Sequence, residues 1–288
     1  MQVVTLIAPA GGLPDSFVAD LRARWTGGPL RWLAPQEAAE FEVESEPADL
    51  WTAWEACQGQ GIDLLLQPAV NRRKRMLLAD MDSTMIQQEC IDELAVVAGV
   101  GEHVAAITAR AMNGEIGFEG ALRERVALLK DLPETVVAEV LRDRITYMPG
   151  GATLLATMKA HGAHAVLVSG GFLSFARPVA AHLGFDEARA NTLLSANGRL
   201  TGEVAEPILG REAKVAALEE VTARIGLGPQ DVLAVGDGAN DLGMLRLAGA
   251  GVALHAKPAV QAECRLRVNH GDLTALLYLQ GYAREDFA

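Results

Sequence analysis

The sequence has 288 residues, of which half are hydrophobic and 22% are charged, a balance typical of a globular protein with a sizeable core. Its 25 basic and 37 acidic residues give a net charge of −12, which argues against binding to nucleic acid or to an anionic membrane surface. The three cysteines are widely spaced, so we expect free thiols and a cytoplasmic location rather than a disulfide framework.

Residues 1–70 are predicted to form a separate α+β module. Short apolar runs predict strands at 3–7, 30–33, 41–43 and 63–66, with helices after Pro14 and around 50–57. This β-α-β-β-α-β order is typical of a ferredoxin-like or ACT-like fold. The first strand lacks a preceding basic segment and no apolar run could span a bilayer, so neither a signal peptide nor a membrane segment is expected. The basic segment 71–75 is interpreted as a solvated linker.

From Met76 the pattern changes to strands that alternate with helices, which predicts an α/β domain over 71–288 with a Rossmann-like parallel sheet. The expected strands are 76–79, 165–168, 232–235 and 252–254. Between the first two lies an insertion, at about 87–149, with apolar residues at helical spacing. We interpret it as a helical cap, an element that excludes water and selects the substrate.

Two carboxylates follow the first of these strands, at Asp80 and Asp82. Side chains two residues apart on an extended segment point the same way, toward the crevice in which α/β proteins bind ligands. Paired buried carboxylates require compensation, and Mg²⁺ prefers oxygen ligands. The pair therefore predicts a Mg²⁺-dependent phosphoryl-transfer site with an aspartate nucleophile, although alone it is also compatible with an ordinary turn.

Three further motifs fall at or just beyond other strand ends. Ser169 and Gly170 follow the second strand, where a hydroxyl and closely approaching backbone amides suit an anion. Lys214 lies early in a helical run and offers a fixed cation for phosphoryl oxygens. Asp237, Asn240 and Asp241 follow the third strand: Asp237 is placed to complete a Mg²⁺ site with Asp80, and the other two to hold metal-bound water or orient Lys214. A turn explains any one motif, but not all four on one sheet.

Together these residues resemble the haloacid dehalogenase-like phosphatases, on the motifs Asp-Met-Asp-Ser-Thr at 80–84 and Gly-Asp-Gly-Ala-Asn-Asp at 236–241. The form of both motifs, with the cap segments 89–94 and 118–126, is similar to the phosphoserine-specific branch. The resemblance covers residue 75 to the end of the chain and leaves the N-terminal module outside.

The resemblance implies a role for each site residue. Asp80 would be the nucleophile and Asp82 the general acid and base. The Asp80 carboxylate, the Asp82 backbone carbonyl and Asp237 would hold Mg²⁺. Phosphoryl oxygens would be bound by a set of polar groups: Ser169, Gly170 and Lys214.

The resemblance also implies O-phospho-L-serine as the substrate, hydrolysed to serine and phosphate as the last step of serine biosynthesis. Glu89 would bind its ammonium group and Arg125 its carboxylate, a chemically matched pair. Phe118 and Met112 are candidate walls of the pocket.

Two alternatives stay open. One is a phosphatase or phosphotransferase for another small phosphate ester, and the other is an amino-acid-sensing regulatory protein. A homodimer through the N-terminal module is also considered.

Overall fold

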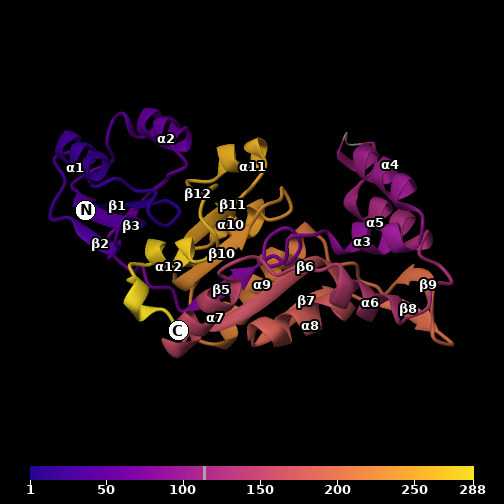
Figure 1. The fold of residues 1–288 in the computed structure, drawn as a ribbon. Helices are drawn as coiled ribbons and strands as arrows, with labels where there is room; N and C mark the ends of the chain where they lie inside the picture. The colour runs from indigo at the N-terminus through magenta and orange to yellow at the C-terminus, as the bar shows by residue number, and fades with distance from the viewer. Residues whose placement is uncertain (113–114) are drawn as a thin grey trace.

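The computed structural model describes residues 1–112 and 115–288, and within them the chain forms a small N-terminal module, a central α/β core and a helical cap (Figure 1). The strands are β1 (Gln2–Ile7), β2 (Arg31–Ala34), β3 (Ala38–Val43), β4 (Asp63–Pro68), β5 (Met76–Ala79), β6 (His164–Phe172), β7 (Glu187–Asn191), β8 (Leu193–Ala196), β9 (Arg199–Val204), β10 (Val232–Gly236), β11 (Ala250–Leu254) and β12 (Leu266–Val268). The helices are α1 (Asp15–Arg24), α2 (Leu50–Gln58), α3 (Cys90–Val97), α4 (Gly101–Met112), α5 (Phe118–Ala127), α6 (Val136–Asp143), α7 (Gly151–Ala160), α8 (Leu173–Leu183), α9 (Arg211–Arg224), α10 (Leu242–Leu247), α11 (Pro258–Glu263) and α12 (Ala275–Leu279).

The N-terminal module has the predicted order of elements, β1-α1-β2-β3-α2-β4. Its four strands pair antiparallel in the order β2-β3-β1-β4, as in a ferredoxin-like sheet. One face of the sheet buries Val4 and Leu6 against α1 and α2. The other face places Ile7 and Leu65 in the same apolar cluster as α12, so the core covers it. An ACT-like role for this module stays a prediction.

The segment 71–75 is not the solvated linker that we expected. Arg72 is half-buried, and its guanidinium donates to Glu40 of β3 (2.6 Å) and to the Leu279 carbonyl at the end of α12 (3.0 Å). Lys74 is buried and donates to the Gln230 carbonyl (2.8 Å). In an extended segment alternate side chains face opposite ways, so every second basic residue turns inward while the others meet solvent.

The core is a six-stranded parallel sheet in the order β12-β11-β10-β5-β6-β7. Helices cover both faces, and this explains why the central strands are apolar throughout. Met76 and Leu78 of β5 pack on the side of α9 and α10, while Leu77 and Ala79 pack on the side of α7 and α8. The predicted α/β architecture with a parallel core is therefore confirmed.

The structure adds strands that the sequence patterns did not predict. Edge strands β7 and β12 extend the sheet on either side. A separate hairpin, β8–β9, turns at Asn197 and Gly198, both with positive φ (53° and 74°), as a tight hairpin requires. Leu200 and Val204 of this hairpin join the main core cluster, and β9 packs against the end of α5.

Helices α3 to α6 occupy the predicted insertion, and we call them the cap. Its two connections to the core lie side by side, with an isolated bridge between Ile86 and Tyr147. The Thr146 backbone N–H donates to the Gln88 side chain (2.9 Å), and the Gln87 N–H donates to the Thr146 carbonyl (2.9 Å). The domain limits at 70 and 71 and the cap limits at about 87 and 149 stay predictions.

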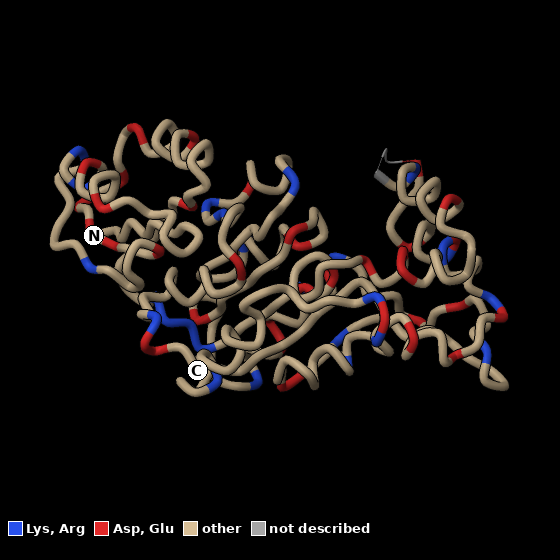
Figure 2. The backbone as a smooth tube through the Cα atoms, in the orientation of Figure 1, with Lys and Arg blue, Asp and Glu red and all other residues tan. Residues whose placement is uncertain are grey.

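Acidic and basic residues are interspersed over the module, the core and the cap (Figure 2). Among the described residues, none of the helices combines the length and the apolar character needed to cross a bilayer.

Candidate active site

Three neighbouring strands bring the sequence motifs together. β5 lies between β10 and β6, so Asp80 after β5, Asp237 after β10 and Ser169 near the end of β6 share one edge of the sheet. The β6–β7 register is irregular between Val168 and Phe172, so the intervening residues form a bulge. The carboxyl edge of a parallel sheet is where α/β proteins bind ligands, and here the three motifs that follow strands fall on it.

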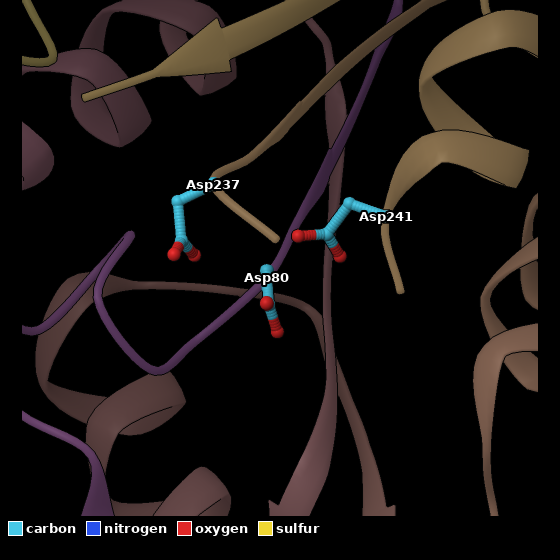
Figure 3. A group of neighbouring side chains, drawn as sticks. All are labelled: Asp80, Asp237 and Asp241. Carbon is cyan, nitrogen blue, oxygen red and sulfur yellow. The ribbon is translucent and has the colours of Figure 1, made fainter. Parts of the chain in front are cut away.

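Asp80, Asp237 and Asp241 form a cluster in which one carboxylate oxygen of each lies within 4.8 Å of the others (Figure 3). Lys214 from α9 reaches this cluster from the buried side. Its Nζ lies 2.6 Å from Asp80 Oδ1 and 2.5 Å from Asp241 Oδ1, and the lysine is only 1% exposed. Asp80 Oδ1 also accepts from the Met81 N–H (2.8 Å), so the orientation of this carboxylate is fixed.

The electrostatics of the cluster leave it short of positive charge. Burial, together with the charge of Asp80, raises the pKa of Asp241 to about 7 and that of Asp237 to about 6. Burial alone would lower the pKa of Lys214, but Asp80 and Asp241 outweigh it and the pKa is raised. Three carboxylates thus face one ammonium group, an arrangement that favours a bound cation.

The donor set fits a hard divalent ion. All the clustered side-chain atoms are carboxylate oxygens, which are the ligands that Mg²⁺ and Mn²⁺ accept. Both oxygens of Asp241 are engaged, Oδ1 with Lys214 and Oδ2 with the Gly238 N–H (2.9 Å), whereas both contacts of Asp80 use Oδ1. Asp80 and Asp237 are therefore the residues best placed to hold the ion, with Thr84 Oγ1 donating to Asp237 (3.1 Å).

Asp82 has different surroundings from Asp80. Its Oδ1 accepts from the Cys90 N–H (2.8 Å) at the start of the cap, and its Oδ2 accepts from Ser169 Oγ (3.1 Å). Burial raises the pKa of Asp82, and the charge of Asp80 raises it further against the lowering effect of the Cys90 amide. Asp82 therefore holds a proton more readily than an ordinary aspartate, as a general acid needs to.

A cavity of about 600 Å³ lies between this edge and the cap. Glu89 and Arg125 both line it, one from just before α3 and one from α5. Burial raises the pKa of Glu89 to about 7, with the charge of Asp82 adding to the shift, and Ser83 Oγ donates to its carboxylate (2.8 Å). Burial lowers the pKa of Arg125, whose Nε donates to the Ala121 carbonyl (3.2 Å). The cavity thus offers an acidic and a basic group to one ligand.

Phe118 stands at the start of α5 and is 40% exposed. A Cβ added at Gly170 would lie 3.3 Å from its ring, and one added at Gly210 would lie 3.4 Å from it, so both glycines allow the ring to approach the core. A Cβ at Gly171 would lie 2.8 Å from Asp82 Oδ2. Met112 is the last residue of α4, and its side chain lies outside what the structure describes.

The structure therefore gathers the predicted residues in two layers. The cavity is lined by the following members of the set: Asp80, Asp82, Glu89, Phe118, Arg125, Gly170, Asp237 and Asn240. Behind them, Ser169, Lys214 and Asp241 are buried and hydrogen-bonded.

Two contributors were missed by the sequence analysis. Thr84 belongs to the Asp80 motif and its hydroxyl could have been weighed there. Asn191 ends β7, and its side-chain amide donates to the Gly170 carbonyl (2.9 Å) in the β6 bulge; no apolar pattern predicts this strand.

Comparison with known proteins adds independent support. The family model described as haloacid dehalogenase-like hydrolase matches residues 77–246, more than half of the chain. The chain belongs to the haloacid dehalogenase-like hydrolases. The family predicted from the motifs is thus confirmed.

Relatives of this hydrolase carry a more specific name. It is 42% identical to a phosphoserine phosphatase of Streptomyces coelicolor over 88% of this chain and 62% of that protein. It is 39% identical to a probable phosphoserine phosphatase of Schizosaccharomyces pombe over 93% of this chain and 89% of that one. The chain spans about three fifths of the length of the first curated relatives it matches.

A solved structure matches almost the whole hydrolase. A haloacid dehalogenase-family hydrolase of Salmonella enterica serovar Typhi superposes with a TM-score of 0.88 at 29% identity, over 96% of this chain and 97% of that one. The arrangement of N-terminal module, core and cap is therefore not peculiar to this protein.

Proposed function

We propose that the protein hydrolyses O-phospho-L-serine to L-serine and phosphate through an aspartyl-phosphate on Asp80. The observation that carries this proposal is one cavity that joins a lysine-anchored Asp80, a second carboxyl with a raised pKa at Asp82, and the opposite charges of Glu89 and Arg125. The names of the curated relatives support the same substrate.

In the first half-reaction Asp80 attacks phosphorus and the bond to the serine oxygen breaks. Both anchoring contacts of Asp80 use Oδ1, so we assign the attack to Oδ2. The leaving oxygen takes its proton from the Asp82 carboxyl, whose raised pKa favours the protonated form. Lys214 and the Ser169 hydroxyl stabilise the charge on the phosphoryl oxygens.

In the second half-reaction water attacks the phosphorus and the bond to Asp80 breaks. Asp82, now ionised, takes the proton from the water and returns to its starting state. The sum of both steps converts one ester and one water into serine and phosphate. The cavity of about 600 Å³ beneath the cap has room for the water of the second step beside the phosphoryl group.

Mg²⁺ is the metal that we propose, held by Asp80 and Asp237 and by the Asp82 backbone carbonyl. When bound it would neutralise the negative charge that gathers around the phosphoryl group. Asp241 would keep Lys214 oriented, and Asn240 would contact the ligand from the cavity wall.

We assign recognition of the ammonium and carboxylate groups of phosphoserine to residues of the cap. Arg125 can bind a carboxylate with two parallel hydrogen bonds, and an ionised Glu89 can bind the ammonium group. Phe118 would close the cavity over the bound ester.

The test is phosphate release from O-phospho-L-serine, phosphothreonine, a sugar phosphate and p-nitrophenyl phosphate. Each is assayed with Mg²⁺, with Mn²⁺, with EDTA and with Asp80→Asn. Metal-dependent release that is strongest on phosphoserine and lost in Asp80→Asn supports the proposal. Release from the other esters alone keeps the mechanism and overturns the substrate. Transfer to an added alcohol would identify a phosphotransferase, and no release from any ester would favour the regulatory alternative.

The N-terminal module is proposed to sense an amino acid or to pair two copies of the chain. Its β-α-β-β-α-β order motivates this role. Serine inhibition and molecular mass in solution test it, and a monomer that serine does not inhibit would contradict it. A cytoplasmic location is proposed from the three free cysteines, all buried.

A further inference from the structure

Asn191 is a buried polar residue at the carboxyl end of the edge strand β7, only 2% exposed. Its Nδ2 donates to two backbone carbonyls, those of Gly170 (2.9 Å) and Leu209 (3.1 Å). Its Oδ1 accepts from the Leu209 N–H (2.7 Å). Both ends of the amide are thus matched to partners, which fixes its orientation.

The two segments that Asn191 joins both carry phosphoryl-binding groups. Gly170 belongs to the β6 bulge and follows Ser169 directly. Leu209 precedes Gly210, the N-terminal cap residue of α9, and Lys214 lies in the second turn of that helix. Ser169 and Lys214 come from segments far apart in the sequence, and one side chain bonds to both segments.

We propose that Asn191 is a positioning residue for the phosphoryl site, which holds the β6 bulge and the start of α9 at a fixed separation. It thereby sets the spacing between Ser169 Oγ and Lys214 Nζ. This inference rests on the proposed phosphoryl chemistry, but not on which ester is the substrate.

The effect of losing the Asn191 hydrogen bonds follows from the way in which anion sites stabilise charge. Donors that are fixed in advance stabilise an anion without having to reorganise when it arrives. A displacement of 1 Å in a site of this kind costs about 100-fold in rate. The hydrogen bonds of Asn191 act on the phosphoryl end of the site. Their loss would therefore weaken the binding of every phosphate ester alike, whereas a change at Arg125 would affect only esters that carry a carboxylate.

The experiment compares Asn191→Ala and Asn191→Asp in the full chain. Asn191→Asp keeps the size of the side chain and the bond from Leu209, but replaces the donor to both carbonyls with an oxygen. The matched control is Thr222→Val. Thr222 is also buried and donates to a backbone carbonyl, that of Leu218 (2.7 Å), on the same helix α9 but away from the site.

Two quantities are measured with Mg²⁺ present: the Kd of inorganic phosphate by calorimetry, and kcat/KM for phosphoserine and p-nitrophenyl phosphate. For both Asn191 variants we expect phosphate affinity to fall about 10- to 100-fold and kcat/KM to fall by a similar factor on both esters. Thr222→Val should lower the melting temperature without changing either quantity.

Folded Asn191 variants with wild-type phosphate affinity would overturn the inference, as would an equal loss in Thr222→Val. If Asn191→Ala does not fold, Asn191→Asp decides. A wild-type chain that binds phosphate but hydrolyses no phosphoserine overturns the proposed substrate, while the phosphate affinities still decide the role of Asn191. A wild-type chain that binds no phosphate overturns both.

Discussion

Asp63 and Asp241 are both fully buried, yet different groups balance their charges. Asp241 at the catalytic edge is paired with an ammonium group, Lys214 Nζ at 2.5 Å. Asp63 at the start of β4 instead accepts from three consecutive backbone N–H groups of the loop 269–271, at 2.7 to 3.3 Å. Burial raises the pKa of both groups, and in each case the hydrogen bonds oppose the shift.

The difference separates a functional site from a structural connection between two parts of the molecule. We call the contact of Asp63 with the loop 269–271 the structural joint. Over the described part of the chain, backbone N–H groups supply all of the hydrogen bonds to Asp63, and these bonds fasten the N-terminal module to the core. At the catalytic edge the charges are left unequal, because one lysine faces three carboxylates. That imbalance costs stability in the free protein and makes a site for a cation.

Lys214→Met should have the largest effect on stability. Removing one partner of a buried ion pair costs about 3–5 kcal/mol in the free energy of unfolding. Urea unfolding measures this cost, and added Mg²⁺ should restore part of it, because the ion binds only the folded chain. Lys159→Met is the control: Lys159 pairs with Asp186 at 2.7 Å on the surface, so about 1 kcal/mol or less is expected. Equal losses of stability in the two variants would contradict the claim that Lys214 balances buried carboxylates at the catalytic edge.

Arg125→Ala should act on the substrate rather than on the fold. A charged hydrogen bond contributes about 1.5–3 kcal/mol, so KM for phosphoserine should rise about 10- to 100-fold. KM for p-nitrophenyl phosphate, which has no carboxylate, should change little. Arg123→Ala is the control, because Arg123 is exposed on the same helix and pairs with Glu206. Equal losses on both esters would remove the basis for assigning Arg125 to the substrate carboxylate.

Asp63→Asn tests the structural joint. An amide keeps one acceptor oxygen but turns an N–H₂ group toward the donors of the loop, so a loss of about 1–3 kcal/mol in stability is expected. The activity of the folded variant should remain, in contrast to Asp80→Asn. Urea unfolding and phosphoserine turnover measure the two effects. Loss of turnover without loss of stability would mean that the joint acts on catalysis.

The pH dependence of the reaction should show the smallest effect. The pKa of Glu89 is raised to about 7, so its carboxyl is neutral below that pH and ionised above it. Only the ionised form attracts an ammonium group, so kcat/KM for phosphoserine should rise with pH, by up to about tenfold between pH 6 and pH 8. Glu89→Gln should flatten this rise, and the pH dependence that remains comes from the phosphate ester and from the other carboxyl groups of the site with raised pKa values, Asp82, Asp237 and Asp241. An unchanged profile in Glu89→Gln would argue against the assignment.

The core of the site could be predicted because its signals are local. Asp80 and Asp237 each follow an apolar strand, and the rule that parallel strands end at one edge brought them together in advance. Neither motif required knowledge of the packing.

The features that the sequence did not predict, the edge strand β7 with Asn191 and the buried basic residues of 71–75, depend on partners that are distant in the sequence. β7 reads Glu-Ala-Arg-Ala-Asn, and its charges are explained by its edge position: Glu187 binds His164 and Arg189 binds Glu220. Without β7 there was no reason to single out Asn191. Arg72 and Lys74 were interpreted as solvated because their acceptors, Glu40 and the backbone carbonyls of Leu279 and Gln230, are all distant in the sequence.

The cover that α12 places on the N-terminal sheet has a consequence for synthesis. The strands of that sheet are complete at Pro68, but α12 ends at Leu279. At roughly 5–20 residues per second, the ribosome needs on the order of 10–40 s to make the roughly 210 residues between them. Throughout that time Ile7 and Leu65 lack the helix that buries them in the finished protein. The unfinished chain, more than the mature one, is therefore the form most exposed to aggregation and most in need of a chaperone.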